Sequence, residues 1–207
     1  CGVQGACAFA IVCAFPPACG ASGLPTGRLG CVAPFCLTRA MSELRLRPAT
    51  PADCPAILHL VTELADYERA VHEVQATAAD FEQRLFGPDA RVHAVMCERA
   101  GEVVGFAVYF FNFSTWQGKL GLYLEDLYVT PAARGTGAGL ALLPRLARVA
   151  LDKDCGRFEW SVLDWNELAI GFYERIGAKP QSEWIRYRLT GEALARLARD
   201  AMPLSAD

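Results

Sequence analysis

Three alternate glycines follow an arginine at the end of a β-rich run and stand directly before a helical pattern. These residues are Arg134, Gly135, Gly137 and Gly139. Because glycine has no β-carbon, the backbone here can turn tightly and bring several N–H groups toward one ligand. A helix that begins at this point adds the positive end of its dipole. The stretch therefore predicts a phosphate or pyrophosphate site, with Arg134 as a fixed cation beside it.

Spacing distinguishes the kinds of nucleotide site that such glycines can form. A P-loop needs Lys-Ser or Lys-Thr after the last glycine, where this chain has Leu140 and Ala141. A dinucleotide-binding fold needs its third glycine at position 140, which is this same leucine. Both patterns therefore fail. A glycine turn that binds nothing stays open as an alternative.

The rest of the pattern predicts one α+β domain, with a mixed, mostly antiparallel twisted sheet and helices on both faces. Alternating apolar residues between turn signals predict strands at 44–50, 91–98, 102–111, 120–129, 157–163 and 183–189. Helical spacing predicts helices that start near Thr50 or Asp53, at Thr77, at Leu140 and at Asn166. Pro144 falls inside the third helix, where it removes a backbone hydrogen bond and predicts a kink.

The first forty residues differ in composition from the rest of the chain. They hold six of the nine cysteines and no acidic residue, and the composition changes at Met41. We expect residues 1–40 to be disordered upstream or artefactual sequence outside the domain, and residues 41–207 to form the domain. A secretory signal is the alternative, since "ACAFAIVCAF" could serve as its apolar core, although no basic region precedes it.

Charge and apolar run length narrow the class of partner. The net charge is −3, and the chain is still more acidic after Met41 because Arg28 and Arg39 precede that residue. An acidic chain does not favour nucleic acid as a partner. Prolines interrupt the N-terminal apolar run before it reaches the ~20 residues of a membrane span. We expect no membrane partner and a cytoplasmic location.

The pattern Arg134-x-x-Gly137-x-Gly139, between a predicted strand and a predicted helix, resembles the acetyl-CoA pyrophosphate loop of the GNAT acetyltransferase superfamily. Further segments are similar to its diamine acetyltransferase branch, which includes spermidine/spermine and thialysine acetyltransferases. They are "RPATPADCPAILHLVTELADYE", "STWQGKLGLYLEDLYV" and "VLDWNELAIGFYERIGA". "STW" and "VALDKDC" are closer to the thialysine relatives. The resemblance runs from about Leu44 to Leu197, and it implies a GNAT-like fold, acetyl-CoA as cosubstrate and a homodimer.

The resemblance also implies how the reaction proceeds. A free alkyl ammonium has a pKa of about 10.4, so a base must remove a proton before the amine can attack. By resemblance, Glu125 takes this proton, directly or through water, and Tyr173 protonates the leaving thiolate of CoA in a ternary complex. Asp126 faces the opposite side of an ideal strand unless a bulge redirects it.

Two sets of binding residues follow from the resemblance. Acetyl-CoA would contact Leu127, Tyr128, Val129, Arg134, Gly135, Thr136, Gly137, Ala138, Gly139, Asn166 and Arg175. The ammonium groups of the acceptor would meet carboxylates and aromatic faces at Tyr67, Glu68, Trp116, Glu125, Asp126 and Glu183. Without the resemblance, Glu68 could be a solvated charge at a helix end, Trp116 a packing residue at a hairpin tip and Tyr173 a core residue.

Three other hypotheses stay open. The acceptor could be a protein N-terminus or lysine, which an acidic pocket would also attract, or the chain could sense acyl-CoA without catalysis. An acetyl-cysteine intermediate at Cys97 or Cys155 is a further route, but neither residue has a histidine nearby in the sequence to activate it. His59, His72 and His93 form no cluster, and we expect no metal.

Overall fold

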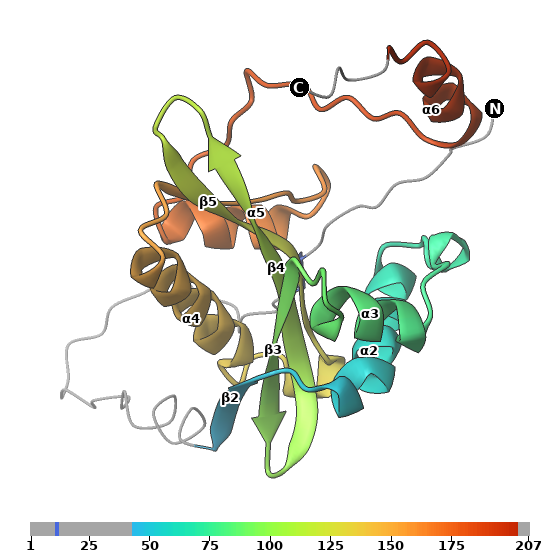
Figure 1. Cartoon of the computed structure of the whole chain (residues 1–207). Coiled ribbons are helices and arrows are strands. Elements are labelled where there is room, and N and C mark those ends of the chain that lie inside the picture. The colour runs from blue at the N-terminus through green and yellow to red at the C-terminus, as the bar shows by residue number, and fades with distance from the viewer. Residues whose placement is uncertain (1–10, 13–42, 203–207) are drawn as a thin grey trace, which may run out of the picture.

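A computed structural model describes residues 11–12 and 43–202 of the 207-residue chain. Most of segment 1–40, on which we made the upstream-sequence and secretory-signal hypotheses, lies outside the described residues. Figure 1 shows a central sheet between two pairs of helices. One face carries α2 (Cys54–Tyr67) and α3 (Ala78–Phe86), and the other carries α4 (Ala138–Asp152) and α5 (Glu167–Arg175). The predicted α+β fold with helices on both faces is confirmed.

Six strands form one mixed sheet in the described part of the chain. They are β1 (Ile11–Val12), β2 (Leu44–Pro48), β3 (Val92–Arg99), β4 (Glu102–Ser114), β5 (Lys119–Val129) and β6 (Arg157–Trp160). The order is β1-β5-β4-β3-β2, and β6 also pairs with β5. The strands from β2 to β5 pair antiparallel, whereas β1 and β6 both run parallel to β5. The same edge of β5 therefore carries β6 at one end and β1 at the other.

Local sequence signals set several of these boundaries. Ala100 and Gly101 both have positive φ between β3 and β4, which suits the tight two-residue turn of the predicted hairpin. Thr77 caps α3 as predicted, because its Oγ1 accepts a hydrogen bond from the Asp80 N–H and the Asp80 carboxylate accepts one from the Thr77 N–H. Helix α4 continues through Pro144 without interruption.

Two apolar clusters pack against the sheet, one on each face. The cluster under α4 and α5 includes Leu124, Leu127, Leu142, Leu146, Phe172 and Tyr173. The cluster under α2 and α3 includes Ile57, Leu60, Leu64, Met96, Phe106 and Tyr128. Consecutive residues Leu127 and Tyr128 of β5 thus enter opposite clusters, as the period of two in a strand requires. This alternation shows which way each side chain of β5 points.

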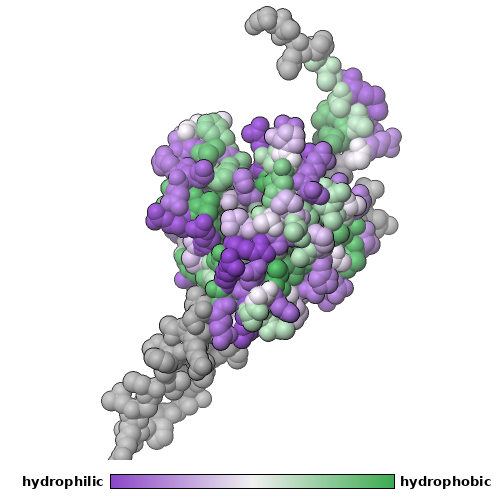
Figure 2. Space-filling view, turned by 60° about the horizontal axis from the view of Figure 1, so that its bottom comes forward, coloured by the Kyte–Doolittle hydropathy of each residue, from purple (hydrophilic) through white to green (hydrophobic). Residues whose placement is uncertain are grey.

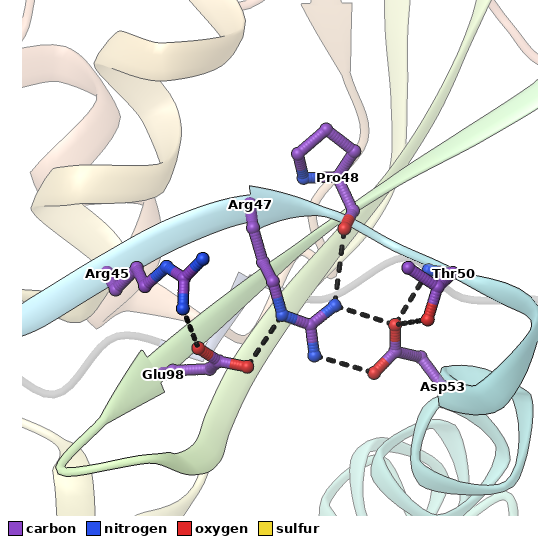
Figure 3. Close-up of polar contacts among 6 residues, drawn as sticks. All are labelled: Arg45, Arg47, Pro48, Thr50, Asp53 and Glu98. Atoms are coloured by element: carbon purple, nitrogen blue, oxygen red, sulfur yellow. Dashed lines mark hydrogen bonds and ion pairs between the residues drawn. The ribbon is translucent and has the colours of Figure 1, made fainter.

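An ion-pair network joins the start of α2 to the sheet (Figure 3). Arg47 on β2 donates two hydrogen bonds of 2.7 Å to the Asp53 carboxylate and one of 2.6 Å to Glu98 on β3. Asp53 also accepts hydrogen bonds from the N–H and hydroxyl of Thr50. We call Asp53 and Glu98 the arginine-paired acids. They fix the entry of α2, whose far end reaches the candidate site.

The expected final strand at 183–189 is wrong, because the structure assigns no strand to these residues. They are extended chain after α5, and α6 (Gly191–Ala198) follows them. Figure 1 shows α6 apart from the sheet, and Figure 2 shows apolar side chains on its projecting lobe. The alternating pattern of residues 183–189 suits a strand, but it does not show whether a neighbouring strand is available for pairing.

Candidate active site

A β-bulge in β5 lies at the two adjacent acidic residues Glu125 and Asp126. Val108 of β4 pairs with Asp126, but the next residue, Tyr109, pairs with Leu124, so Glu125 is the extra residue. The pairing of β5 with β6 ends at this point, with Leu124 opposite Trp160. Asp126, beside Leu127, is thereby turned to the face that carries α2. A bulge is thus present directly before Asp126, as the sequence analysis allowed, and the pairing of β5 with β6 does not extend past it.

Glu68 at the end of α2 joins these two residues, and we call Glu68, Glu125 and Asp126 the acid cluster. Burial first, and then the negative charge of Asp126, raises the pKa of Glu68 to about 8. The same two causes, in the same order, raise the pKa of Glu125 to about 7 against the opposing charges of two arginines. Burial raises the pKa of Asp126 to about 6. Three half-buried acids with raised pKa values form a site that a cation would stabilise.

The glycine stretch forms a tight turn that leads into α4. Gly135 and Gly137 have φ values of 77° and 96°, which favour glycine, and Gly137 is the N-cap of α4. Thr136 fastens the turn through a 2.7 Å hydrogen bond from its hydroxyl to the Ala133 carbonyl. The first N–H groups of a helix have no acceptor within it, and no described side chain caps α4. The turn thus presents backbone donors at the positive end of a fifteen-residue helix.

Arg134 lies against α2, next to the glycine stretch. Its guanidinium carbon is 5.5 Å from the ring centre of Tyr67 and 5.6 Å from that of Tyr128, and its Nε donates a hydrogen bond of 3.2 Å to the Val129 carbonyl. Aromatic faces on two elements therefore hold the cation close to the entry of the turn. Its contact with a phosphate stays a prediction.

Helix α5 brings Tyr173 and Asn166 to the other side of the opening. Tyr173 is only 5% exposed, and its ring centre lies 5.0 Å from that of Trp160, the last residue of β6 paired to β5. Asn166 caps α5 by accepting a hydrogen bond from the Ala169 N–H at 3.2 Å. Its amide nitrogen is buried and has no hydrogen-bond partner among residues 11–12 and 43–202. Such a donor fits a ligand acceptor, as the predicted acetyl-CoA contact requires.

The edge of β5 that follows the bulge is covered by β1. Ile11 pairs with Leu127, and Val12 pairs with Tyr128. Leu127, Tyr128 and Val129 have buried side chains, so only their backbone groups could contact acetyl-CoA. A ligand along this edge would have to displace β1.

Two predicted acceptor-binding residues are exposed to solvent. Trp116 is 91% exposed in the turn between β4 and β5, and the six residues of β5 that precede Glu125, roughly 20 Å of strand, follow that turn. Glu183 is exposed in a turn after α5. Arg175 is exposed in the last turn of α5. The structure brings Tyr67, whose ring lies 5.9 Å from that of Trp165, to the end of α2 beside Glu68.

Our sequence analysis missed a polar group formed by a residue of β5, the residue after β6 and an arginine of the C-terminal chain. The charge of that arginine, Arg186, lowers the pKa of Glu125 against the effect of burial. Tyr123 and Ser161 share a hydrogen bond of 2.8 Å, and Arg186 donates to both hydroxyls. Tyr123 could have been found from its position two residues before Glu125, since such residues share a strand face. Nothing in the sequence pointed to Arg186 in the same way, because it fell in the predicted strand 183–189 and the sequence did not show which strand that segment would pair with.

The pKa values of two cysteines argue against the acetyl-cysteine route. Burial raises the pKa of the Cys97 thiol to about 11 and also raises that of Cys155, so neither is poised as a thiolate nucleophile. No group of three or more His, Cys, Asp or Glu residues is placed to hold a metal ion in the described ranges. None of the described helices is long and apolar enough to cross a bilayer. A cavity of about 500 Å³ between α3, β3 and α4 includes none of the predicted site residues in its lining.

Comparisons with known proteins agree with this geometry. Residues 57–178 match the model of the acetyltransferase (GNAT) family. The chain is 37% identical over 169 residues to thialysine N-epsilon-acetyltransferase of Mus musculus, covering 76% of this chain and 99% of that protein. It is 36% identical to spermidine/spermine N(1)-acetyltransferase-like protein 1 of Homo sapiens, covering 77% of this chain and 24% of that protein. A solved integron cassette protein of V. cholerae has a TM-score of 0.65 and 28% identity, covering 76% and 99% of the two chains.

Proposed function

This chain belongs to the acetyltransferase (GNAT) family, and we propose that it acetylates a primary amine of a small polyamine or a thialysine-like amino acid by direct attack in a ternary complex. Its relatives identify it as an acetyl-CoA-dependent amine N-acetyltransferase of the diamine acetyltransferase branch. The acceptor and the roles of individual residues are the proposal. On the family resemblance we also propose a cytoplasmic homodimer without nucleic-acid or membrane partners, which sedimentation and cell fractionation would test.

The observation that carries the proposal is the acid cluster at the bulge of β5. Glu125 leaves the regular pairing at the bulge, Asp126 stays paired with Val108 directly after it, and Glu68 at the end of α2 feels the charge of Asp126. Buried carboxyls with raised pKa values are stabilised when an ammonium group arrives. The acid cluster therefore supports a cationic acceptor, with Tyr67 as an aromatic wall beside it.

Glu125 is suited to act as the base. Its pKa of about 7 lies near the operating pH, where a carboxylate can hold a proton and release it again. Asp126, whose pKa is about 6, keeps negative charge near the amine while Glu125 takes the proton.

Tyr173 is proposed as the acid that protonates the leaving sulfur. A phenol has a pKa near 10, whereas a thiol has one of about 8.5, so the transfer depends on placement rather than on intrinsic acidity. The ring is fixed by Trp160 and Phe172, at 5.0 and 5.6 Å between ring centres. This packing fixes the ring beside Trp160, the residue at which the pairing of β6 with β5 ends.

The residues that would hold acetyl-CoA fit it chemically. The turn before α4 offers N–H donors for its phosphates, and the buried amide nitrogen of Asn166 offers a further donor. Acetyl-CoA supplies an activated acetyl thioester when bound. The chain contributes orientation, the removal of a proton at Glu125 and the delivery of one from the Tyr173 hydroxyl.

The test is CoA release by the full chain with spermidine, spermine, putrescine, thialysine and lysine. We expect turnover of at least one small amine and a fall in kcat of about 100-fold in Tyr173→Phe. Tyr109→Phe is the matched control, because it removes a hydroxyl from a half-buried ring that lines the cavity away from the site. If the chain acetylated peptides but no small amine, the proposed acceptor class would be wrong. If it bound acetyl-CoA but acetylated nothing, the proposed catalytic roles of Glu125 and Tyr173 would be wrong.

A further inference from the structure

Arg134, which leads into the glycine turn, is held by residues of both α2 and β5. Its guanidinium carbon lies 5.5 Å from the ring centre of Tyr67 and 5.6 Å from that of Tyr128. Its Nε donates a hydrogen bond of 3.2 Å to the Val129 carbonyl, and its Nη2 donates a long one of 3.5 Å to the Tyr128 hydroxyl. These rings and acceptors restrict a side chain that has many rotamers when it is free.

The same contacts leave much of the guanidinium available to a ligand. An arginine has five N–H donors, and the hydrogen bonds to Val129 and Tyr128 use the Nε–H and one N–H of Nη2. These bonds leave both N–H groups of Nη1 and the second one of Nη2 for another acceptor. A phosphate is an anionic acceptor that a guanidinium binds strongly. Arg134 is therefore held in place without being used up.

The two tyrosines are themselves fixed by the fold. Tyr128 is 2% exposed and belongs to the apolar cluster under α2 and α3. Burial and then the charge of Glu63 on α2 raise the pKa of its phenol, whereas the charge of Arg134 lowers it, so its hydroxyl is within electrostatic reach of both groups. Tyr67 packs against the same apolar cluster, and its ring centre lies 5.9 Å from that of Trp165. The support for Arg134 is thus in place before any ligand binds.

We propose that Tyr67 and Tyr128 are positioning residues for acetyl-CoA, because they preorganise Arg134 to bind its phosphates. The inference rests on the proposed function, since the ligand is the cosubstrate of that reaction. It also gives Tyr67 a second role, because the resemblance assigned this ring to the acceptor amine alone. Neither tyrosine contacts the phosphates. Each acts through the guanidinium, by reducing the ordering cost that a free arginine side chain would incur on binding.

The experiment measures the dissociation constant of CoA by calorimetry in the full chain and its variants. Arg134→Gln should raise this constant by roughly 10- to 100-fold, because a charge-assisted contact with phosphate is lost. Tyr67→Leu should raise it by roughly 3- to 10-fold, and Tyr128→Phe by about 2- to 4-fold because its hydrogen bond to Arg134 is long. Tyr109→Phe, which removes a phenol hydroxyl away from the site, is the matched control and should leave the constant unchanged.

Double variants distinguish a positioning role from a merely structural one. If the tyrosines act through Arg134, Tyr67→Leu and Tyr128→Phe should each change CoA affinity by less than about 1.5-fold in the Arg134→Gln background. S-acetylpantetheine has no phosphate, so kcat/KM with this acetyl donor should stay near wild type in Arg134→Gln and in Tyr128→Phe.

Three results would overturn the inference. They are unchanged CoA affinity in Arg134→Gln, unchanged affinity in both tyrosine variants, and tyrosine effects that are as large in the Arg134→Gln background as in the wild type. A wild-type chain that does not bind CoA would instead overturn the proposed function.

Discussion

The molecule holds two groups of carboxylates on the α2 side of the sheet, one at each end of that helix. The arginine-paired acids at the start of α2 share the Arg47 guanidinium, as Figure 3 shows. That arginine, through its hydrogen bonds, holds the pKa of Asp53 well below the ordinary range, and Asp53 and Glu98 in turn raise the pKa of Arg47. At the other end of α2, burial raises the pKa of all three members of the acid cluster, and the charge of Asp126 raises the pKa of Glu68 and Glu125 further.

The difference lies in whether the protein itself supplies the counter-charge. The arginine-paired acids are satisfied before any ligand arrives, so their interaction contributes to folding. The acid cluster carries an electrostatic cost in the folded chain that a cationic substrate could offset. Similar side chains thus serve structure at one end of α2 and binding at the other. Replacing an acidic residue by its neutral amide in each group should therefore have different effects, on stability for the arginine-paired acids and on activity for the acid cluster.

The largest effect is expected from Glu125→Gln, which removes the proposed base. We expect kcat to fall by roughly 100- to 10,000-fold, with little loss of stability because a carboxyl of raised pKa is removed. The wild-type rate should rise as pH passes about 7, since the carboxylate must be ionised to take a proton. Initial rates between pH 5.5 and 9 measure this dependence, which the variant should lack.

Glu159→Gln provides the matched control for that comparison. Glu159 lies on β6 and pairs with Arg157 at 2.9 Å, so its charge is already compensated within the chain. Its loss should leave both kcat and the pH profile near wild type. If Glu125→Gln kept more than a tenth of the wild-type kcat, the base would have to be sought elsewhere in the site.

Asp53→Asn tests the other group and should lower stability without lowering kcat. Removing one partner of a buried ion pair costs about 3–5 kcal/mol, and here we expect about 2–3 kcal/mol because the Arg47 side chain is 23% exposed. At roughly 2–4 °C per kcal/mol, Tm should fall by about 5–10 °C. The pair stabilises the fold above the ordinary Asp pKa and loses its effect in acid, so the variant and wild type should converge as pH falls below about 3.

Asp80→Asn is a control of similar local geometry. Asp80 makes the same contacts to the Thr77 N–H and hydroxyl that Asp53 makes to Thr50, and no arginine forms an ion pair with it in the described residues. It should lower Tm by less than Asp53→Asn does. Equal shifts in the two variants would mean that the capping contacts, rather than Arg47, explain the stability.

These contrasts also show which features could be predicted from sequence. The caps, the β3–β4 hairpin and the buried face of α2 follow from residues close together in the chain, such as Thr77 with Asp80 and Ile57 with Leu64. Short-range physics sets these features, so the pattern of neighbours was sufficient. The glycine turn before α4 belongs to the same class, because positive φ at Gly137 depends on the residue itself.

The parts that could not be predicted depend on partners distant in sequence. The bulge at Glu125 exists only relative to β4, and the raised pKa of Glu68 depends on its burial in the fold and on Asp126 far along the chain. Residues 183–189 alternate like a strand, yet alternation does not state whether a free edge is available. The approach of Arg186 to Tyr123 had no local signature either. The counter-charges that distinguish the two ends of α2 therefore emerged only from the fold.

The smallest expected effect, Glu68→Gln, tests whether the acid cluster destabilises the free protein. Because the folded pKa of about 8 lies above the ordinary value of 4.5, the folded state keeps a proton that the unfolded chain releases between those pH values. The free energy of unfolding should therefore fall in wild type as pH rises from about 4.5 to 8. Glutamine removes this dependence and should stabilise the chain by about 1 kcal/mol at pH 8.5, a figure reduced for solvent screening of a half-buried group. Urea unfolding at pH 4.5 and 8.5 measures it, with exposed Glu82→Gln as control, and destabilisation at pH 8.5 would show that Glu68 is already compensated like Asp53.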